Sequence, residues 1–221
     1  MLLKDQITAL KEKCLNCQEC PLGRRNLDGF DPHVFGSGNI KADMMVVAEA
    51  PGYNETVEKK VLVGRAGQFY NEKILKIANI ERKSVFTTNA ALCRPPNNRK
   101  PLPGELETCL PLLDSQVVLV DPKLIVILGN VPLYSVCDIP PSGITKYHGI
   151  LRLSREWSDG KKRLVFPMFH PGYCLRGSGL KEVKEDALGL GFFVQQHLSK
   201  SLVELHDFAG KKLYLEEQGG L

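Results

Sequence analysis

The sequence predicts an α/β protein of three layers, in which helices cover both faces of a central parallel sheet of four strands. The first observation is its length, since 221 residues suit one domain with a sizeable core. The second is a set of four short apolar segments, rich in β-branched residues or Phe, which are typical of buried strands. The third is that helical patterns alternate with these segments, which favours parallel strands joined by helices.

The predicted strands span residues 43–49, 84–91, 123–129 and 163–170. Apolar residues at helical spacing predict helices over 67–79, 104–120 and 180–198, and a short helix over 201–208. In the first of these helices, Phe69, Ile74 and Ile77 fall near one face. The sequence contains no internal repeat and no low-complexity linker, so we expect a single domain over residues 1–221.

The composition excludes two classes of protein. With 43 % hydrophobic and 24 % charged residues, the chain is not a disordered one. It has no apolar run near the ~20 residues that a membrane helix needs. Asp5 and Glu12 lie in a start without a cleavage signature, so we expect no signal peptide and a cytoplasmic, nucleoid-associated protein. The net charge of +4 permits an anionic partner without requiring one.

Polar loops stiffened by Pro and Gly follow three of the predicted strands. They are Glu49-Ala50-Pro51-Gly52, residues 93–99 (CRPPNNR) and His170-Pro171-Gly172-Tyr173. In a parallel sheet, ligands bind just beyond the carboxyl ends of the strands. We therefore expect these loops to converge on one site.

The seven cysteines indicate a metal or cluster site rather than disulfides, because the expected compartment is reducing. Cys14, Cys17 and Cys20 form a C-x2-C-x2-C run, and fifteen residues separate Cys93 from Cys109. Two such pairs can supply four thiolates either to zinc or to an iron–sulfur cluster, and spacing alone leaves both open. Cys137 and Cys174 stand apart, and we interpret them as ordinary thiols.

Taken in order, these motifs resemble the iron–sulfur (family 4) branch of the uracil-DNA glycosylases. The resemblance runs from about Cys17 to Leu198. It is carried by C-x2-C-P-L at residues 17–22, VFGSG at 34–38, EAPG at 49–52 with Glu55, GRAG at 64–67, TNA at 88–90 with CRPP at 93–96, and His170-Pro171 with Leu175-Arg176. Each motif alone is weak, but all of them in this order are a specific signal.

The resemblance implies that Cys17, Cys20, Cys93 and Cys109 hold a structural 4Fe–4S cluster, and it favours that cluster over zinc. Residues 1–40 then form a cluster-binding N-terminal segment, and Cys14 is the spare thiol. The sequence suggests no role for residues 201–221 beyond a short helix with a frayed end.

The implied reaction is hydrolysis of the N-glycosidic bond of uracil, or of a 5-substituted uracil, in DNA. The base must first leave the stack, and it then departs as an anion from a cationic sugar. The Asn89 amide offers a donor and an acceptor to the base edge. His170, as a neutral imidazole, would donate to O2 of uracil. Glu49 would lie by the sugar, with Glu55 as the second candidate to orient the water, and Gly52 and Ala50 would line the base pocket.

The sequence departs from the family pattern around this pocket. Leu62 stands where the family usually has an aromatic residue that would stack on the base, and Thr56 replaces an Asp after Glu55. Leu62 with Gly52 could leave room for a 5-substituent, and Thr56 or Tyr53 could bond its hydroxyl. The departures therefore raise 5-hydroxymethyluracil as a substrate beside plain uracil.

DNA would be held mainly through its phosphates. The predicted contacts are Arg94, Arg99, Lys100 and Arg176, with Leu175 as a wedge into the vacated stack. We expect a monomer.

Three other functions compete with this one. A protein that traps uracil-DNA covalently would need a His in residues 93–103, where the sequence has none. A non-catalytic iron–sulfur DNA-binding module of a replication or repair complex would not need Glu49, Asn89 and His170. A zinc-stabilised hydrolase of small nucleotides would not need basic loops around the site.

Overall fold

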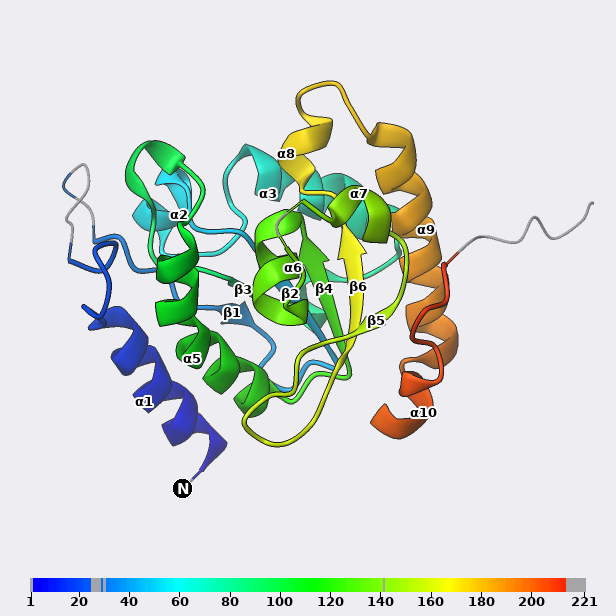
Figure 1. The fold of residues 1–221 in the computed structure, drawn as a ribbon, viewed down its shortest axis with the longest axis horizontal. Helices are drawn as coiled ribbons and strands as arrows, with labels where there is room; N and C mark the ends of the chain where they lie inside the picture. The colour runs from blue at the N-terminus through cyan, green and yellow to red at the C-terminus, as the bar shows by residue number, and fades with distance from the viewer. Residues whose placement is uncertain (1, 25–28, 30, 141, 214–221) are drawn as a thin grey trace, which may run out of the picture.

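The computed structural model describes residues 2–24, 29, 31–140 and 142–213. Its sheet has six strands in the order β1-β3-β2-β4-β6-β5 (Figure 1). The four central strands are parallel, as predicted: β2 (Met44–Ala48), β3 (Phe86–Asn89), β4 (Leu124–Leu128) and β6 (Leu164–Met168). Every residue of these strands is buried, because helices cover both faces of the sheet.

Two short edge strands were not predicted. β1 (Ser37–Gly38) pairs antiparallel with β3, and β5 (Arg152–Leu153) pairs antiparallel with β6. Two residues are too few for an alternating pattern, so the sequence gives no signal for them.

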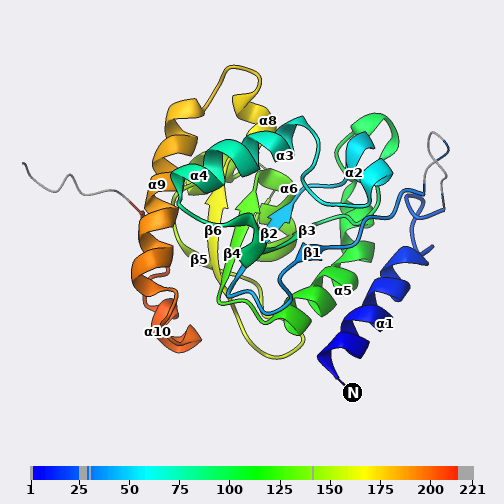
Figure 2. The same ribbon diagram turned by 180° about the vertical axis from the view of Figure 1, so that it is seen from behind.

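The helices form one layer on each face of the sheet. On one face lie α5 (Pro103–Val120) and α6 (Asn130–Cys137), with α1 (Leu3–Leu15) packed outside α5. On the other face, α3 (Arg65–Phe69) continues through a π-helical turn (Tyr70–Ile74) into α4 (Leu75–Ile77), which packs against α9 (Leu180–His197) (Figure 2). This three-layer arrangement confirms the predicted fold class.

Four short α-helices lie in the connections: α2 (Tyr53–Glu58), α7 (Ile144–Tyr147), α8 (Pro171–Cys174) and α10 (Leu202–His206). Two 3₁₀ turns, Arg82–Ser84 and Pro96–Asn98, complete the set in the part of the chain that the structure describes. The long helices predicted over 104–120 and 180–198 lie within a residue of α5 and α9, whereas α1 and α6 were missed.

The described part of the C-terminal segment, residues 207–213, packs beside residues 149–151. After α10, the backbone N–H of Leu151 donates to the Lys211 carbonyl at 2.9 Å, and the Leu213 N–H donates to the Gly149 carbonyl at 2.9 Å. Residues 210–213 are thus tied beside 149–151, while the rest of the predicted tail, 214–221, lies outside the described residues. Within the described residues, no helix has the length and apolar character needed to cross a membrane.

Candidate active site

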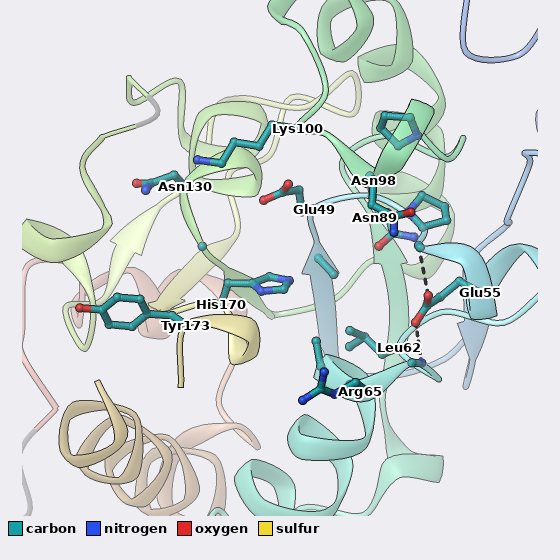
Figure 3. Close-up of a pocket in the computed structure, with 18 of the residues that line it drawn as sticks. Glu49, Glu55, Leu62, Arg65, Asn89, Asn98, Lys100, Asn130, His170 and Tyr173 are labelled. Carbon is teal, nitrogen blue, oxygen red and sulfur yellow. Dashed lines mark hydrogen bonds between the residues drawn. The ribbon is translucent and has the colours of Figure 1, made fainter. Parts of the chain in front are cut away.

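The loops after β2, β3, β4 and β6 meet around a cavity of about 560 Å³ at the carboxyl edge of the sheet (Figure 3). The convergence expected from the sequence is therefore present. Ten of the predicted site residues line this cavity: Glu49, Ala50, Gly52, Glu55, Leu62, Asn89, Arg99, Lys100, His170 and Arg176.

Asn89 ends β3 with its side chain turned into the cavity and only 1 % exposed. Its Nδ2 has no hydrogen-bond partner among the residues that the structure describes. A buried amide donor without a partner costs about 1–3 kcal/mol of stability. Such a group is suited to a ligand that offers an acceptor inside the cavity.

His170 caps the start of α8, and its Nδ1 accepts a hydrogen bond from the Gly172 N–H at 3.1 Å. Since Nδ1 is the acceptor, the ring proton of the neutral imidazole is on Nε2. Burial and, after it, the charge of Arg176 lower the pKa of His170 to about 4. The side chain at neutral pH is therefore an uncharged donor.

Gly129 helps to place this histidine. Its φ of +95° suits glycine, and a Cβ added there would lie 3.0 Å from the His170 Cβ. The residue before α6 thus fits against His170 only without a side chain.

Glu49 follows β2 directly and is half-buried. Burial raises the pKa of its carboxyl, while the charges of Lys100 and Arg176 oppose that rise. Figure 3 shows the Glu49 carboxylate and the Lys100 side chain on the same side of the cavity as Asn130. Because the Glu49 carboxylate is partly buried, its interaction with a positive charge on a bound ligand would be stronger than in water.

Glu55 has a different environment from Glu49. Its carboxylate accepts hydrogen bonds from the backbone N–H groups of Gly52 at 3.1 Å, Val63 at 3.0 Å and Gly64 at 2.7 Å. The side chain thereby joins two loops that line the cavity (Figure 3). We expected Glu55 as a second candidate to orient the attacking water. Its carboxylate oxygens instead accept hydrogen bonds from the backbone.

Leu62 forms an aliphatic wall of the cavity, as the sequence suggested. Its φ is +58°, and its carbonyl accepts a hydrogen bond from Asn71 Nδ2 at 3.1 Å. Gly67 packs on it so closely that a Cβ at Gly67 would lie 2.0 Å from the Leu62 carbonyl carbon.

The predictions for Thr56 and Tyr53 as pocket residues were wrong. Thr56 is 1 % exposed, and its hydroxyl donates to the Tyr53 carbonyl at 2.7 Å. The Tyr53 ring is 44 % exposed and lies against the Arg94 guanidinium, 5.2 Å from it. Neither residue lines the cavity, because each side chain makes its contacts elsewhere.

The predicted phosphate contacts divide into two groups. Arg94 is buried, with its Nε bonded to Asn98 Oδ1 at 2.8 Å, and Arg99 makes a bidentate pair with Glu105 at 2.8 and 2.6 Å. Burial makes Arg94 unsuitable as a phosphate contact, and Arg99 is already held by a carboxylate. Lys100 and Arg176 line the cavity and are exposed.

Sequence reasoning missed several lining residues. Arg65, the second residue of GRAG, is exposed at the cavity, and Arg65, Lys100 and Arg176 form no ion pair with any described residue. Phe169 also lines the cavity, and Tyr173 stacks on it with ring centres 5.1 Å apart. The sequence could have indicated these residues because they lie in or next to the motifs that carry the resemblance.

Leu175, the predicted wedge, is 40 % exposed, and a side chain that enters the DNA stack has to be exposed.

The cysteines form a second centre. Burial raises the pKa of the Cys93 thiol, and the thiols of Cys109, Cys20 and Cys17 raise it further. The Cys17 turn and the Cys93 segment adjoin each other, because His33 contacts the Cys17 carbonyl and forms a backbone bridge with Cys93. The Leu92 N–H points at Cys109 Sγ at 3.3 Å, the kind of bond that tunes a cluster ligand. Among the described residues, no group of three or more His, Cys, Asp or Glu is arranged around a single metal ion. A mononuclear zinc would need sulfurs about 3.8 Å apart, given Zn–S bonds of about 2.3 Å. Four thiols are also the ligand set of a 4Fe–4S cluster, so the chemistry of Cys17, Cys20, Cys93 and Cys109 fits the group that the resemblance implies.

The fold and the cavity define an α/β protein with a preformed site at the carboxyl edge of its sheet, built from an amide, a neutral imidazole and a carboxylate. The chain belongs to the uracil-DNA glycosylase superfamily, whose family model matches residues 35–188.

Several curated proteins to which the chain is similar are named type-4 uracil-DNA glycosylases. It is 37 % identical over 186 residues to the type-4 uracil-DNA glycosylase of Sulfurisphaera tokodaii, covering 82 % of this chain and 81 % of the relative. It is 33 % identical over 208 residues to that of Saccharolobus solfataricus, covering 92 % of both chains. It is 37 % identical over 169 residues to that of Thermotoga maritima, covering 76 % of this chain and 82 % of the relative. The resemblance drawn from the motifs is thereby confirmed.

Proposed function

We propose that the protein is a monofunctional DNA glycosylase that hydrolyses the N-glycosidic bond of uracil in DNA and leaves an abasic site. The observation that carries the proposal is Asn89, an amide buried at the end of β3 whose Nδ2 lacks a partner among the described residues and faces the cavity. Uracil presents O4 as an acceptor and N3–H as a donor, which match the two ends of this amide.

The other polar groups of the cavity match the charges that develop in the reaction. As the glycosidic bond breaks, negative charge builds on the uracil ring, and the His170 Nε2–H can donate to O2. Positive charge builds on the sugar, and the Glu49 carboxylate stabilises it. Water then adds to C1′, and its proton ends on the departing base.

We assign Glu55 to holding Gly52 and residues 63–64 in place, since its oxygens already accept three backbone N–H groups. Lys100, Arg176 and Arg65 surround the mouth of the cavity and would contact the phosphates of the flipped nucleotide and its neighbours.

Plain uracil is the proposed substrate, and 5-hydroxymethyluracil is the comparison. The case for the larger base depended on Thr56 or Tyr53 bonding its hydroxyl, and neither side chain lines the cavity. Leu62 and Gly52 remain as the residues that would set the room at the C5 edge.

We further propose that Cys17, Cys20, Cys93 and Cys109 hold a 4Fe–4S cluster, on the strength of their all-thiol chemistry and of the contacts that bring the Cys17 turn beside the Cys93 segment. When bound, the cluster supplies no group to the reaction and cross-links the N-terminal segment to the loop after β3.

The test combines an iron assay with cleavage of single-stranded oligonucleotides that carry one uracil, 5-hydroxymethyluracil or thymine, followed by alkali. We expect cleavage at uracil, less at 5-hydroxymethyluracil and none at thymine, with Asn89→Ala as the inactive control. Iron-loaded, folded protein that binds DNA but cleaves none of the three would favour the binding module. Cleavage of free deoxyuridine alone would favour the nucleotide hydrolase. Size-exclusion chromatography tests the expected monomer.

A further inference from the structure

His33 joins the two halves of the cysteine centre. Its side chain is buried, with Nε2 2.7 Å from the Cys17 carbonyl oxygen and Nδ1 2.5 Å from Asp31 Oδ1. Its backbone forms an antiparallel bridge with Cys93, next to which the Val34 N–H donates to the Leu92 carbonyl at 2.8 Å. One residue therefore contacts both the Cys17 turn and the Cys93 segment.

Lys59 links this point to α2. It directly follows the helix, and its Nζ donates to the Asp31 carbonyl at 2.5 Å and to the His33 carbonyl at 3.1 Å. The same Nζ lies 3.1 Å from the Asp31 carboxylate. The C-terminal end of α2 is thus attached to the segment that holds Cys17.

The N-terminal end of α2 is attached to the other cysteine segment. Tyr53, the first residue of the helix, lies under the guanidinium of Arg94, which directly follows Cys93. Arg94 also bonds Asn98, a residue of the cavity wall. One end of this short helix therefore rests on residues 31–33, which contact Cys17, and the other end rests on the segment that carries Cys93.

Between these two ends, α2 shapes the cavity through Glu55. The Glu55 carboxylate holds the N–H groups of Gly52 and Gly64, and both residues line the cavity. A displacement of α2 would move this carboxylate, and with it two walls of the base pocket.

We propose that α2 couples the cysteine centre to the cavity, with Lys59, Asp31 and His33 as positioning residues, so that occupancy of either centre stabilises the other. The proposal rests on the proposed function, since it takes the cluster to bind the thiols and DNA to bind the cavity. Coupling between two binding sites is reciprocal in free energy, so a ligand in the cavity stabilises the bound cluster if the cluster shapes the cavity. We expect this stabilisation to appear as slower loss of iron.

The experiment measures the rate of iron release from the purified iron-loaded protein to a ferrous chelator. Release is followed with and without a saturating oligonucleotide that carries an abasic-site analogue plus free uracil, with binding verified by fluorescence anisotropy. In the wild type we expect DNA to slow release by roughly fivefold or more, the lower end of typical couplings. In Lys59→Met we expect the slowing to fall below about twofold, and in Lys59→Arg we expect it to return.

Lys60→Met is the matched control, because it removes the same charge one residue along the chain from an exposed side chain. It should respond to DNA as the wild type does. A Lys59→Met protein that is protected as well as the wild type would overturn the proposal, because DNA would then be shielding the cluster directly. Wild-type release that is insensitive to DNA would overturn it as well.

Failure of the proposed function gives different results. Wild-type protein purified without iron would overturn both the cluster and the coupling. DNA that slows iron release from a protein unable to cleave uracil would sink the proposed chemistry and leave the coupling intact.

Discussion

The protonation state of His170 is the most direct test of the proposed chemistry. Burial first, and then the charge of Arg176, lower its pKa from 6.5 to about 4. At about pH 5.5, an imidazole with a pKa of about 4 is only about 3 % protonated, whereas one of pKa 6.5 is about 90 % protonated. His170 should therefore remain a neutral donor well below the pH at which an ordinary histidine is charged.

The assay is two-dimensional ¹H–¹⁵N NMR of the imidazole rings across this pH range, with His170→Gln to identify the signals among five histidines. We expect His170 in the Nε2–H tautomer at neutral pH, because the Gly172 N–H occupies Nδ1. Arg176→Met should raise the pKa only in part, since burial is the larger cause. Titration of His170 near 6.5, or the Nδ1–H tautomer, would refute the assignment of His170 as the neutral donor to O2.

The same shift has a consequence for stability. Between about pH 6.5 and 4 the unfolded chain binds a proton at residue 170 and the folded chain does not, so stability falls as the pH falls through this window. A shift of about 2.5 pKa units corresponds to about 3 kcal/mol at 1.36 kcal/mol per unit. Urea unfolding should show the wild type losing about that much more than His170→Gln between these pH values. Parallel pH dependence of the two proteins would contradict the buried neutral state.

Three substitutions test the other parts of the cavity. Asn89→Ala should lower single-turnover excision of uracil by about 100-fold or more while leaving the urea midpoint unchanged or higher, because it removes a buried donor that lacks a described partner; a large loss of stability would mean that Asn89 is a structural residue. Glu55→Gln should lower the free energy of unfolding by about 2–4 kcal/mol, since an amide cannot accept from three backbone N–H groups. Lost excision with wild-type stability would instead give Glu55 a direct chemical role. Gly129→Ala should reduce kcat by about tenfold or more, because its Cβ would press on His170 at a positive φ; Gly104→Ala, where a Cβ has open space, is the control and should leave kcat unchanged.

The parts of the fold that the sequence predicted well are those with a strong local pattern. The segments that became β2, β3, β4 and β6 could be predicted because short apolar runs of their length favour buried strands, and the intervening helices favoured a parallel arrangement. The order of the strands in the sheet was not predicted. α6 was missed because it is apolar on nearly all sides, with Val131, Leu133 and Val136 all buried against its neighbours. A helix without a polar face has no amphipathic period to detect.

The site residues likewise divide into those that the sequence could place and those that it could not. Glu49, Asn89 and His170 could be placed because each lies at the end of a strand or within two residues of it, so the sheet itself fixes where they lie. Arg99 and Thr56 could not, because their partners depend on how loops and short helices turn. Arg99 meets Glu105 at the start of α5, and Thr56 turns back to the Tyr53 carbonyl. Spacing along the chain carries no information about either contact.

The charges around the cavity favour an ionised carboxylate at Glu49 and an uncharged imidazole at His170. Burial disfavours the charged form of both groups, because it raises the pKa of Glu49 and lowers that of His170. Arg176 acts on both in one direction: its charge lowers the pKa of Glu49, which favours the carboxylate, and lowers that of His170, which favours the uncharged ring. One guanidinium at the mouth of the cavity therefore favours the anion that a cationic sugar needs and the neutral donor that a departing uracil anion needs. Lys100 adds to the first effect, so the same side chains proposed to hold the phosphates also set the ionisation of the groups below them.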